Sequence, residues 1–152
     1  TEEKKQLALD AGADEVILYT QDNFVEEVNK ITNGQGLEVV YDSVGQTTFD
    51  AGMDCLKPRG YMVLYGQSSG AVPPVDPQLL NRKGSIFLTR PTLASYMLNR
   101  AELNWRSGDI FRWIEEGQLQ IRIGLSLPLK NAARAQDDLA ARKTTGKVIL
   151  IP

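Results

Sequence analysis

Residues 37–66 read LEVVYDSVGQTTFDAGMDCLKPRGYMVLYG, and this stretch decides the predicted fold. It starts and ends with apolar segments, residues 37–41 and 61–65, which have the length and the β-branched and aromatic content of buried strands. Between them a threonine can cap a helix whose apolar side chains recur at helical spacing. These positions are Thr47 or Thr48 as the cap, then Phe49, Met53 and Leu56. A strand, a helix and a second strand in this order predict two parallel strands joined by a right-handed crossover.

The same arrangement is expected on both sides of this stretch. Residues 15–19 are apolar and rich in strand formers, and a helical pattern follows them as far as Ile31. Residues 85–89 are a further strand candidate after a proline-rich loop. We therefore expect four parallel strands between residues 15 and 89, with helices on both faces of the sheet. The predicted fold class is α/β, with a partial doubly wound, Rossmann-like parallel sheet.

The pattern changes after Arg90. A longer helix is expected over residues 101–116, and its Trp105 and Trp113 are expected to pack in a core. The remaining elements are a strand over 125–129 that Pro128 interrupts, a helix over 131–142 and a closing strand over 147–151, whose partner strand is expected outside this sequence. We predict two parts, an incomplete NADP-binding Rossmann domain over 1–90 and a C-terminal return segment of helices and short strands over 91–152.

Composition excludes several classes of function. The net charge of −2 and the pI near 5.2 give no reason to expect nucleic acid as a partner. No apolar run approaches the ~18 residues of a membrane span, so no membrane is expected. The chain has no histidine and a single cysteine, Cys55, so it offers neither a zinc ligand set nor a Ser-His-Asp triad. A lone cysteine is also typical of a reducing cytoplasm, where we expect the protein.

Ligand binding in an open parallel sheet occurs beyond the carboxyl ends of the strands. Three such ends carry turn residues, at 19–22, 42–45 and 66–70, and they include glycines that allow backbone to approach a ligand. The alternative is that these are ordinary strand-to-helix turns, in which Gly, Ser and Asp are common anyway. No GxGxxG phosphate loop occurs, so these patterns alone do not predict a complete dinucleotide site.

Five segments, in order along the chain, carry a resemblance to a known family. They are AGAD at 11–14, VVYDSVG at 39–45, RGYMVLYGQSSG at 59–70, NRKGSIFLTRPTL at 81–93 and TTGKVILIP at 144–152. Together they resemble the C-terminal part of the quinone oxidoreductase (zeta-crystallin-like) family of zinc-free medium-chain dehydrogenases.

The resemblance implies a two-domain enzyme that uses NADPH to transfer hydride to quinones or similar conjugated carbonyls, without zinc. A GroES-like catalytic domain, the first two strands and the glycine loop would precede this chain, and residues 91–152 would return to that catalytic domain. The fragment alone is then expected to be inactive, and its catalytic residues stay unknown.

The resemblance also implies which residues contact the cofactor. Lys4 would contact the 2′-phosphate of NADPH and Arg142 would reach back to the cofactor, and two cations suit a group with close to two negative charges. The remaining implied contacts are Tyr19 beside the adenosine phosphate, Ser43, Val44 and Gly45 on the adenine-ribose side, and Tyr65, Gly66, Gln67 and Ser68 beneath the nicotinamide and its ribose. The acid that would mark an NAD enzyme belongs at the end of a strand that would precede Thr1, so the choice of NADPH rests on the resemblance.

Other functions stay open. A related enoyl or alkenal reductase of the same superfamily fits the same residues, because most substrate contacts would come from the other domain. A non-enzymatic nucleotide-binding or structural protein is the second alternative. We also expect a homodimer formed through the edge strand at residues 84–90, since residues 85–89 carry no charge and no proline to protect that edge. The alternative at this edge is a strand covered by the following helix.

Overall fold

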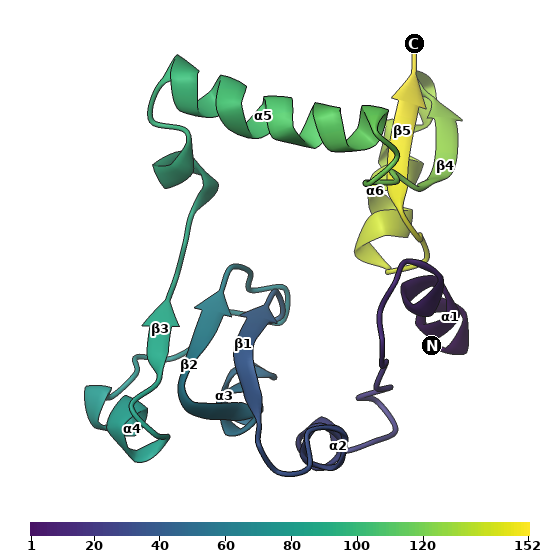
Figure 1. Ribbon diagram of the computed structural model, residues 1–152. Helices are drawn as coiled ribbons and strands as arrows, with labels where there is room; N and C mark the ends of the chain where they lie inside the picture. Colours follow the sequence, from purple (N-terminus) through teal and green to yellow (C-terminus); the bar gives the residue numbers. More distant parts are fainter. The chain divides into compact units, whose positions relative to one another are not determined.

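The computed structural model describes residues 1–152 and contains two compact units, Thr1–Ser95 and Tyr96–Pro152 (Figure 1). The first holds a three-stranded sheet and the second a two-stranded sheet. No helix is long and apolar enough to cross a membrane. Whether these units correspond to the two expected domains stays a prediction.

The sheet of the first unit is parallel throughout, as predicted. Its strands are β1 (Leu37–Asp42), β2 (Leu56–Leu64) and β3 (Phe87–Thr89), in the order β1-β2-β3. The crossovers carry α3 (Phe49–Asp54) and α4 (Pro77–Arg82). The sequence pattern missed α4, although Asp76 caps it by accepting a hydrogen bond from Gln78 N at 2.9 Å and Pro77 opens it. The α/β fold class with a Rossmann-like parallel sheet is confirmed.

The hydrophobic core lies on one face of this sheet. Met62 at the centre of β2 is fully buried, and its neighbours in register, Val40 and Leu88, pack against the same cluster. The cluster consists of Phe49, Met53, Leu56, Met62, Leu64 and Ile86. Because Leu79 and Leu80 of α4 pack there too, α3 and α4 cover the same face.

The opposite face is exposed. Val39, Tyr61 and Phe87 are neighbours in register across the three strands, and all three are exposed. The rings of Tyr61 and Phe87 stack with their centroids 4.6 Å apart. The expectation of helices on both faces is therefore wrong for this unit. Apolar residues on both sides of a strand indicate that both sides suit burial, and they do not identify the covering element.

The expected strand at residues 15–19 is also absent. Residues 15–18 are irregular, and the carbonyl of Leu18 accepts hydrogen bonds from Gln21 N (2.8 Å) and Asp22 N (3.0 Å) in a turn. A strand requires a hydrogen-bonded neighbour, and no strand of this chain pairs with the segment. The helices on either side, α1 (Glu2–Asp10) and α2 (Phe24–Ile31), are capped by Thr1 and Asn23, whose side chains accept hydrogen bonds from Lys4 N and Val25 N.

The second unit is built around a parallel pair of strands, β4 (Ile123–Pro128) and β5 (Lys147–Ile151). The partner of β5 therefore lies within this chain, contrary to expectation. Between the strands lie η2 (Leu129–Asn131) and α6 (Ala132–Ala140), and η1 (Leu93–Tyr96) precedes α5 (Arg100–Glu115).

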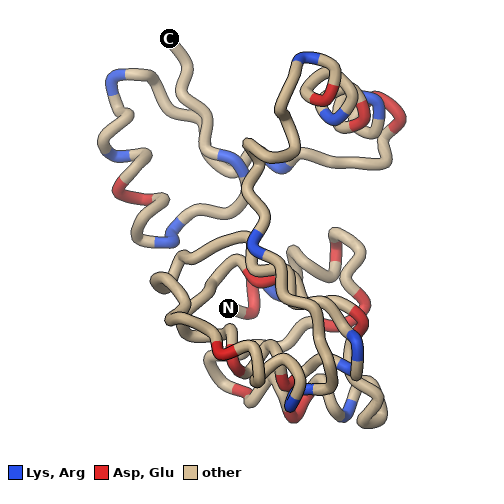
Figure 2. The backbone as a smooth tube through the Cα atoms, turned by 90° about the vertical axis from the view of Figure 1, so that its left-hand side faces the viewer, with Lys and Arg blue, Asp and Glu red and all other residues tan.

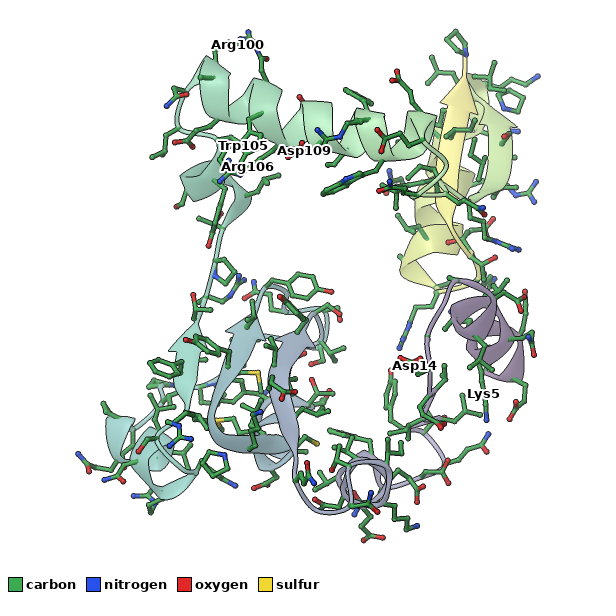
Figure 3. All side chains as sticks on the ribbon, viewed as in Figure 1. Lys5, Asp14, Arg100, Trp105, Arg106 and Asp109 are labelled. Carbon is green, nitrogen blue, oxygen red and sulfur yellow. The ribbon has the colours of Figure 1, made fainter.

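The expected burial of the tryptophans of α5 is wrong. Trp105 is 63% exposed and Trp113 is 40% exposed, and α5 has no buried residue. Trp105 instead lies beside the guanidinium of Arg106, which is 4.6 Å from its ring centroid and 5.5 Å from that of Tyr96 (Figure 3). Amphipathic spacing in α5 indicates an apolar side but cannot show whether a partner covers it.

Candidate functional site

Two loops meet at the carboxyl end of the sheet in the first unit. Residues 43–48 follow β1 and residues 65–70 follow β2, and parallel pairing brings both to the same edge. Backbone and serine groups then join the loops. The hydrogen bonds that join residues 42–48 to residues 65–70 are Tyr65 N to Asp42 O (2.9 Å), Gly66 N to Asp42 O (3.2 Å), Ser68 N to Ser43 O (3.3 Å), Ser69 N to Val44 O (2.8 Å), Ser69 Oγ to Val44 O (2.8 Å), Thr47 N to Ser69 Oγ (3.1 Å) and Gln46 N to Gly70 O (3.2 Å).

Two glycines allow this close approach. A Cβ at Gly66 would lie 2.8 Å from Ser43 Cα and closer still to Ser43 O. Gly45 has a φ of +89°, and a Cβ there would lie 2.8 Å from Gly70 O. The sequence suggested that these glycines let backbone approach a ligand, whereas the structure shows that they let one loop approach the other. The result is a continuous backbone surface at the sheet edge.

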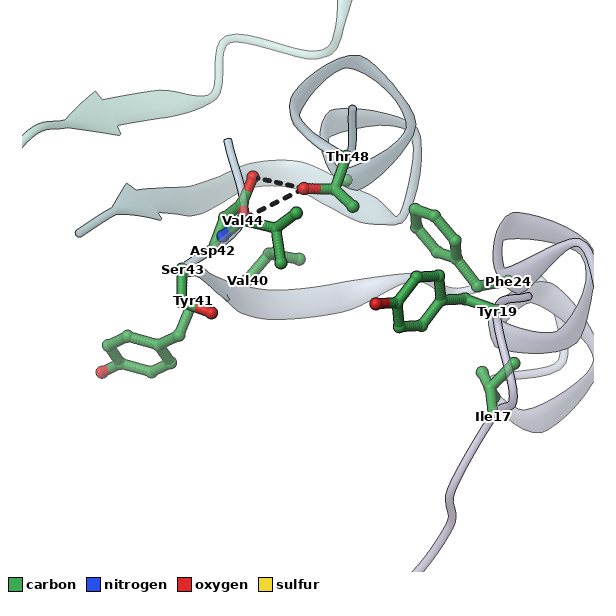
Figure 4. Close-up of a pocket in the computed structure, with 10 residues that line it drawn as sticks. Ile17, Tyr19, Phe24, Val40, Tyr41, Asp42, Ser43, Val44 and Thr48 are labelled. Atoms are coloured by element: carbon green, nitrogen blue, oxygen red, sulfur yellow. Dashed lines mark hydrogen bonds between the residues drawn. The ribbon is translucent and has the colours of Figure 1, made fainter. Parts of the chain in front are cut away.

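Asp42 is the buried polar residue of this edge. It is 6% exposed, and its Oδ1 accepts hydrogen bonds from Val44 N (2.7 Å) and Gly45 N (3.0 Å). The hydroxyl of Thr48 donates to Oδ1 and Oδ2, each at 3.0 Å (Figure 4). Thr48 occupies the N-cap position of α3. Its side chain makes no capping hydrogen bond there, because its hydroxyl donates to Asp42.

A pocket of about 230 Å³ opens beside β1 (Figure 4). It brings together three of the implied cofactor residues, Tyr19, Ser43 and Val44. Its other walls are mainly apolar: Ile17, Phe24, Val40, Tyr41 and Gly52, with Asp42 and Thr48 at the polar end. Whole-ligand pockets measure roughly 300–1,000 Å³. This pocket is therefore smaller than a whole-ligand site and has room for one part of a larger ligand.

The other implied residues lie outside this pocket. Gly45 and residues 65–68 belong to the joined loops. Lys4 is exposed on α1 and does not line the pocket. Arg142 follows α6 in the second unit and has a left-handed φ of 58°. Among the charged residues of the C-terminal segment 131–152, the basic ones, Arg134, Arg142, Lys143 and Lys147, outnumber the acidic ones, Asp137 and Asp138 (Figure 2).

Cys55 is not a candidate nucleophile. It is buried, and its Sγ donates to Ala51 O at 3.4 Å. Burial raises the pKa of this thiol, and the nearby charge of Asp54 raises it further. A buried cysteine with a raised pKa is inert at neutral pH.

Sequence reasoning missed the roles of Asp42, Thr48 and Ser69. All three lie in segments that were singled out, but none was expected to organise the site. The sequence contained a signal for the role of Asp42. This residue directly follows the predicted buried strand at 37–41 and begins a tight turn that ends at Gly45.

A parallel sheet whose carboxyl-end loops form a joined backbone surface beside a pocket defines a Rossmann-like α/β protein. The chain belongs to the zinc-binding dehydrogenase family, whose model matches residues 11–150. The residues present do not fit a zinc site in this chain, which has no histidine, one buried cysteine and no cluster of three His, Cys, Asp or Glu side chains.

Relatives confirm the resemblance to quinone oxidoreductases. Quinone oxidoreductase 1 of Escherichia coli (strain K12) is 44% identical over 154 aligned residues, which cover 100% of this chain and 47% of that protein. The 2-haloacrylate reductase of a Burkholderia species is 39% identical, covering 100% of this chain and 46% of the relative. The crystal structure of Escherichia coli quinone oxidoreductase complexed with NADPH matches with a TM-score of 0.95 at 44% identity, over 100% of this chain and 47% of that one. The chain thus spans about half the length of these relatives and matches their C-terminal part.

Proposed function

We propose that the full-length protein that carries this chain is an NADPH-dependent quinone oxidoreductase, and that this chain supplies part of its cofactor site. When bound, NADPH supplies a hydride, which together with a proton reduces a quinone or similar conjugated carbonyl to the two-electron product. The observation that carries the proposal is the pair of joined loops at 43–48 and 65–70 beside a pocket. The relative solved with NADPH supports it.

The residues of this chain would bind and orient the cofactor. We propose that Tyr19, Ser43 and Val44 hold its adenosine end, because they share a pocket with apolar walls and the right size for one ring system. Gly45 would complete that side. Tyr65, Gly66, Gln67 and Ser68 would lie under the nicotinamide end, on the loop joined to it. Because hydrogen bonds already fix the backbone of the two loops, cofactor binding would cost little additional conformational entropy there.

Lys4 and Arg142 would provide positive charge for the 2′-phosphate and so the preference for NADPH. Arg142 follows the C-cap of α6 with a left-handed φ of 58°, a conformation that it shares with Asn33, Arg59 and Ser85, so its role is proposed on its charge alone. The mainly basic C-terminal segment around Arg142 also suits an anionic ligand.

The test is oxidation of NADPH by 1,4-benzoquinone, followed at 340 nm, with NADH as the matched cofactor. The full-length protein should oxidise NADPH much faster than NADH. The isolated 152-residue chain should be inactive, with weak or undetectable NADPH affinity, because it has no GxGxxG loop for the pyrophosphate. Micromolar binding of NADPH to the isolated chain by calorimetry would contradict this account.

The alternative function is reduction of the C=C bond of an unsaturated acid or carbonyl compound. The 2-haloacrylate reductase at 39% identity favours it specifically. The same assay with 2-chloroacrylate in place of the quinone separates the two, since the true substrate should give the higher kcat/KM. A protein that binds NADPH and reduces neither would favour a nucleotide-binding or structural role.

We further propose that the protein is a zinc-independent cytoplasmic homodimer that joins its sheets through residues 84–90. In this chain β3 is an edge strand, and Phe87 on it is half exposed. An unprotected edge pairs readily with another. Phe87→Pro removes a hydrogen-bond donor from the middle of the edge. Light scattering should then show a monomer. A variant that is folded by circular dichroism and still dimeric would exclude this edge.

A further inference from the structure

We infer that Asp42 is the positioning residue of the cofactor site, holding both carboxyl-end loops in the arrangement that receives the adenosine and nicotinamide ends. This inference rests on the proposed cofactor site. Asp42 does not need to touch the cofactor for this role. It acts through Val44 and Gly45 on one side and through Tyr65 and Gly66 on the other.

The side chain of Asp42 fixes the first loop. Its carboxylate accepts from Val44 N at 2.7 Å and Gly45 N at 3.0 Å, and the Thr48 hydroxyl donates to both oxygens. These donors lie at the start, middle and end of loop 43–48. A buried carboxylate accepting several hydrogen bonds holds its donors firmly, because an unmet bond to a buried charge is costly.

The backbone of the same residue fixes the second loop. The carbonyl oxygen of Asp42 accepts from Tyr65 N at 2.9 Å and from Gly66 N at 3.2 Å. A shift of residue 42 therefore moves both loops together. No other residue of this edge contacts one loop through its side chain and the other through its carbonyl oxygen.

The contacts of Asp42 are separate from the hydrophobic core. Its hydrogen-bond partners are backbone and hydroxyl groups of the loops, whereas stability of the sheet rests on a cluster around Met53 and Met62. Removing the carboxylate should therefore loosen the loops and lower stability somewhat, while the core and the sheet stay folded. This separation makes a positioning role distinguishable from a purely structural one.

The experiment compares Asp42→Ala and Asp42→Asn with the parent in the full-length protein. Asp50→Ala is the matched control, because Asp50 is an exposed aspartate on the neighbouring helix α3 with no bond to either loop. The measurements are the NADPH dissociation constant from fluorescence titration, KM and kcat with 1,4-benzoquinone, and the urea midpoint of unfolding.

Asp42→Ala should raise the NADPH dissociation constant and the KM for NADPH by roughly tenfold or more, since it removes several hydrogen bonds to a charged acceptor. The value of KM for the quinone should change little, and Asp50→Ala should match the parent. Asp42→Asn should raise the NADPH dissociation constant less, by roughly threefold to fivefold, because its amide oxygen can still accept hydrogen bonds from Val44 N and Gly45 N. Partial rescue by Asn without a matching change in the urea midpoint would identify positioning.

Parent-like NADPH binding by a folded Asp42→Ala variant would overturn the inference. If that variant does not fold, Asp42→Asn decides: a raised dissociation constant at an unchanged urea midpoint supports the role, and an unchanged dissociation constant refutes it. A parent protein that binds no NADPH would refute the proposed function itself, which is measured first and separately.

Discussion

Replacement of Gly66 by alanine tests the joined loops most directly. The added Cβ would lie 2.8 Å from Ser43 Cα and nearer to Ser43 O, so the loops must separate. Three hydrogen bonds cross at this point: Tyr65 N and Gly66 N to Asp42 O at 2.9 and 3.2 Å, and Ser68 N to Ser43 O at 3.3 Å. At a net value of ~0.5–1.5 kcal/mol each, their loss should destabilise the protein by about 2–4 kcal/mol.

Urea unfolding followed by far-ultraviolet circular dichroism measures this change, and NADPH titration measures its effect on binding. The control is Gly108→Ala in α5, where an added Cβ meets nothing within 4 Å. That change should stabilise the helix by roughly 0.5–1 kcal/mol. A Gly66→Ala variant with the parent's urea midpoint and the parent's affinity for NADPH would refute the account of the loops.

Three further predictions concern charge and strain. Lys4→Ala in the full-length protein should weaken NADPH binding by about 1.5–3 kcal/mol and NADH binding far less. Equal losses for the two cofactors in calorimetry would place Lys4 away from the 2′-phosphate. Arg142→Gly should raise the melting temperature, because glycine adopts the φ of 58° without strain, while weakening NADPH; unchanged affinity would remove Arg142 from the site. The ion pair with Lys57 on β2 lowers the pKa of Glu38 on β1 below its ordinary value of 4.5. Its stabilisation is therefore present at neutral pH and is lost as the pH falls through that lowered value, so the urea midpoints of Glu38→Gln and the parent should differ at pH 6, and the difference should shrink as the pH is lowered below 4.5.

The parallel pairing of β1, β2 and β3 could be predicted because it depends on local patterns. Each strand shows as an apolar run between turn residues, and the connections between the strands are long enough to hold a helix, which favours parallel crossovers over hairpins. The closing strand, β5, was located for the same reason. The strand predicted at 125–129 corresponds to β4, but its pairing with β5 was not predicted, because strand pairing depends on the geometry of α6 and β4 rather than on the strand's own sequence.

The failures share a physical cause, which is dependence on a distant partner. Residues 15–19 have the composition of a strand but no neighbour to pair with in this chain. Trp105 and Trp113 have helical spacing but no covering surface. In the site, the loops could be located from turn chemistry. The role of Asp42 could not, because it depends on three donors converging after the chain folds.

The order of the strands has a consequence for synthesis of the chain on the ribosome. Each strand that has a partner pairs with the strand next to it in the sequence, β1 with β2, β2 with β3 and β4 with β5. Translation proceeds at roughly 5–20 residues per second. Every strand therefore finds its partner within seconds of emerging, and the loop closed by each pairing is short, which keeps its entropic penalty small. The sheet can grow by addition at one edge, in the direction in which the polypeptide is made.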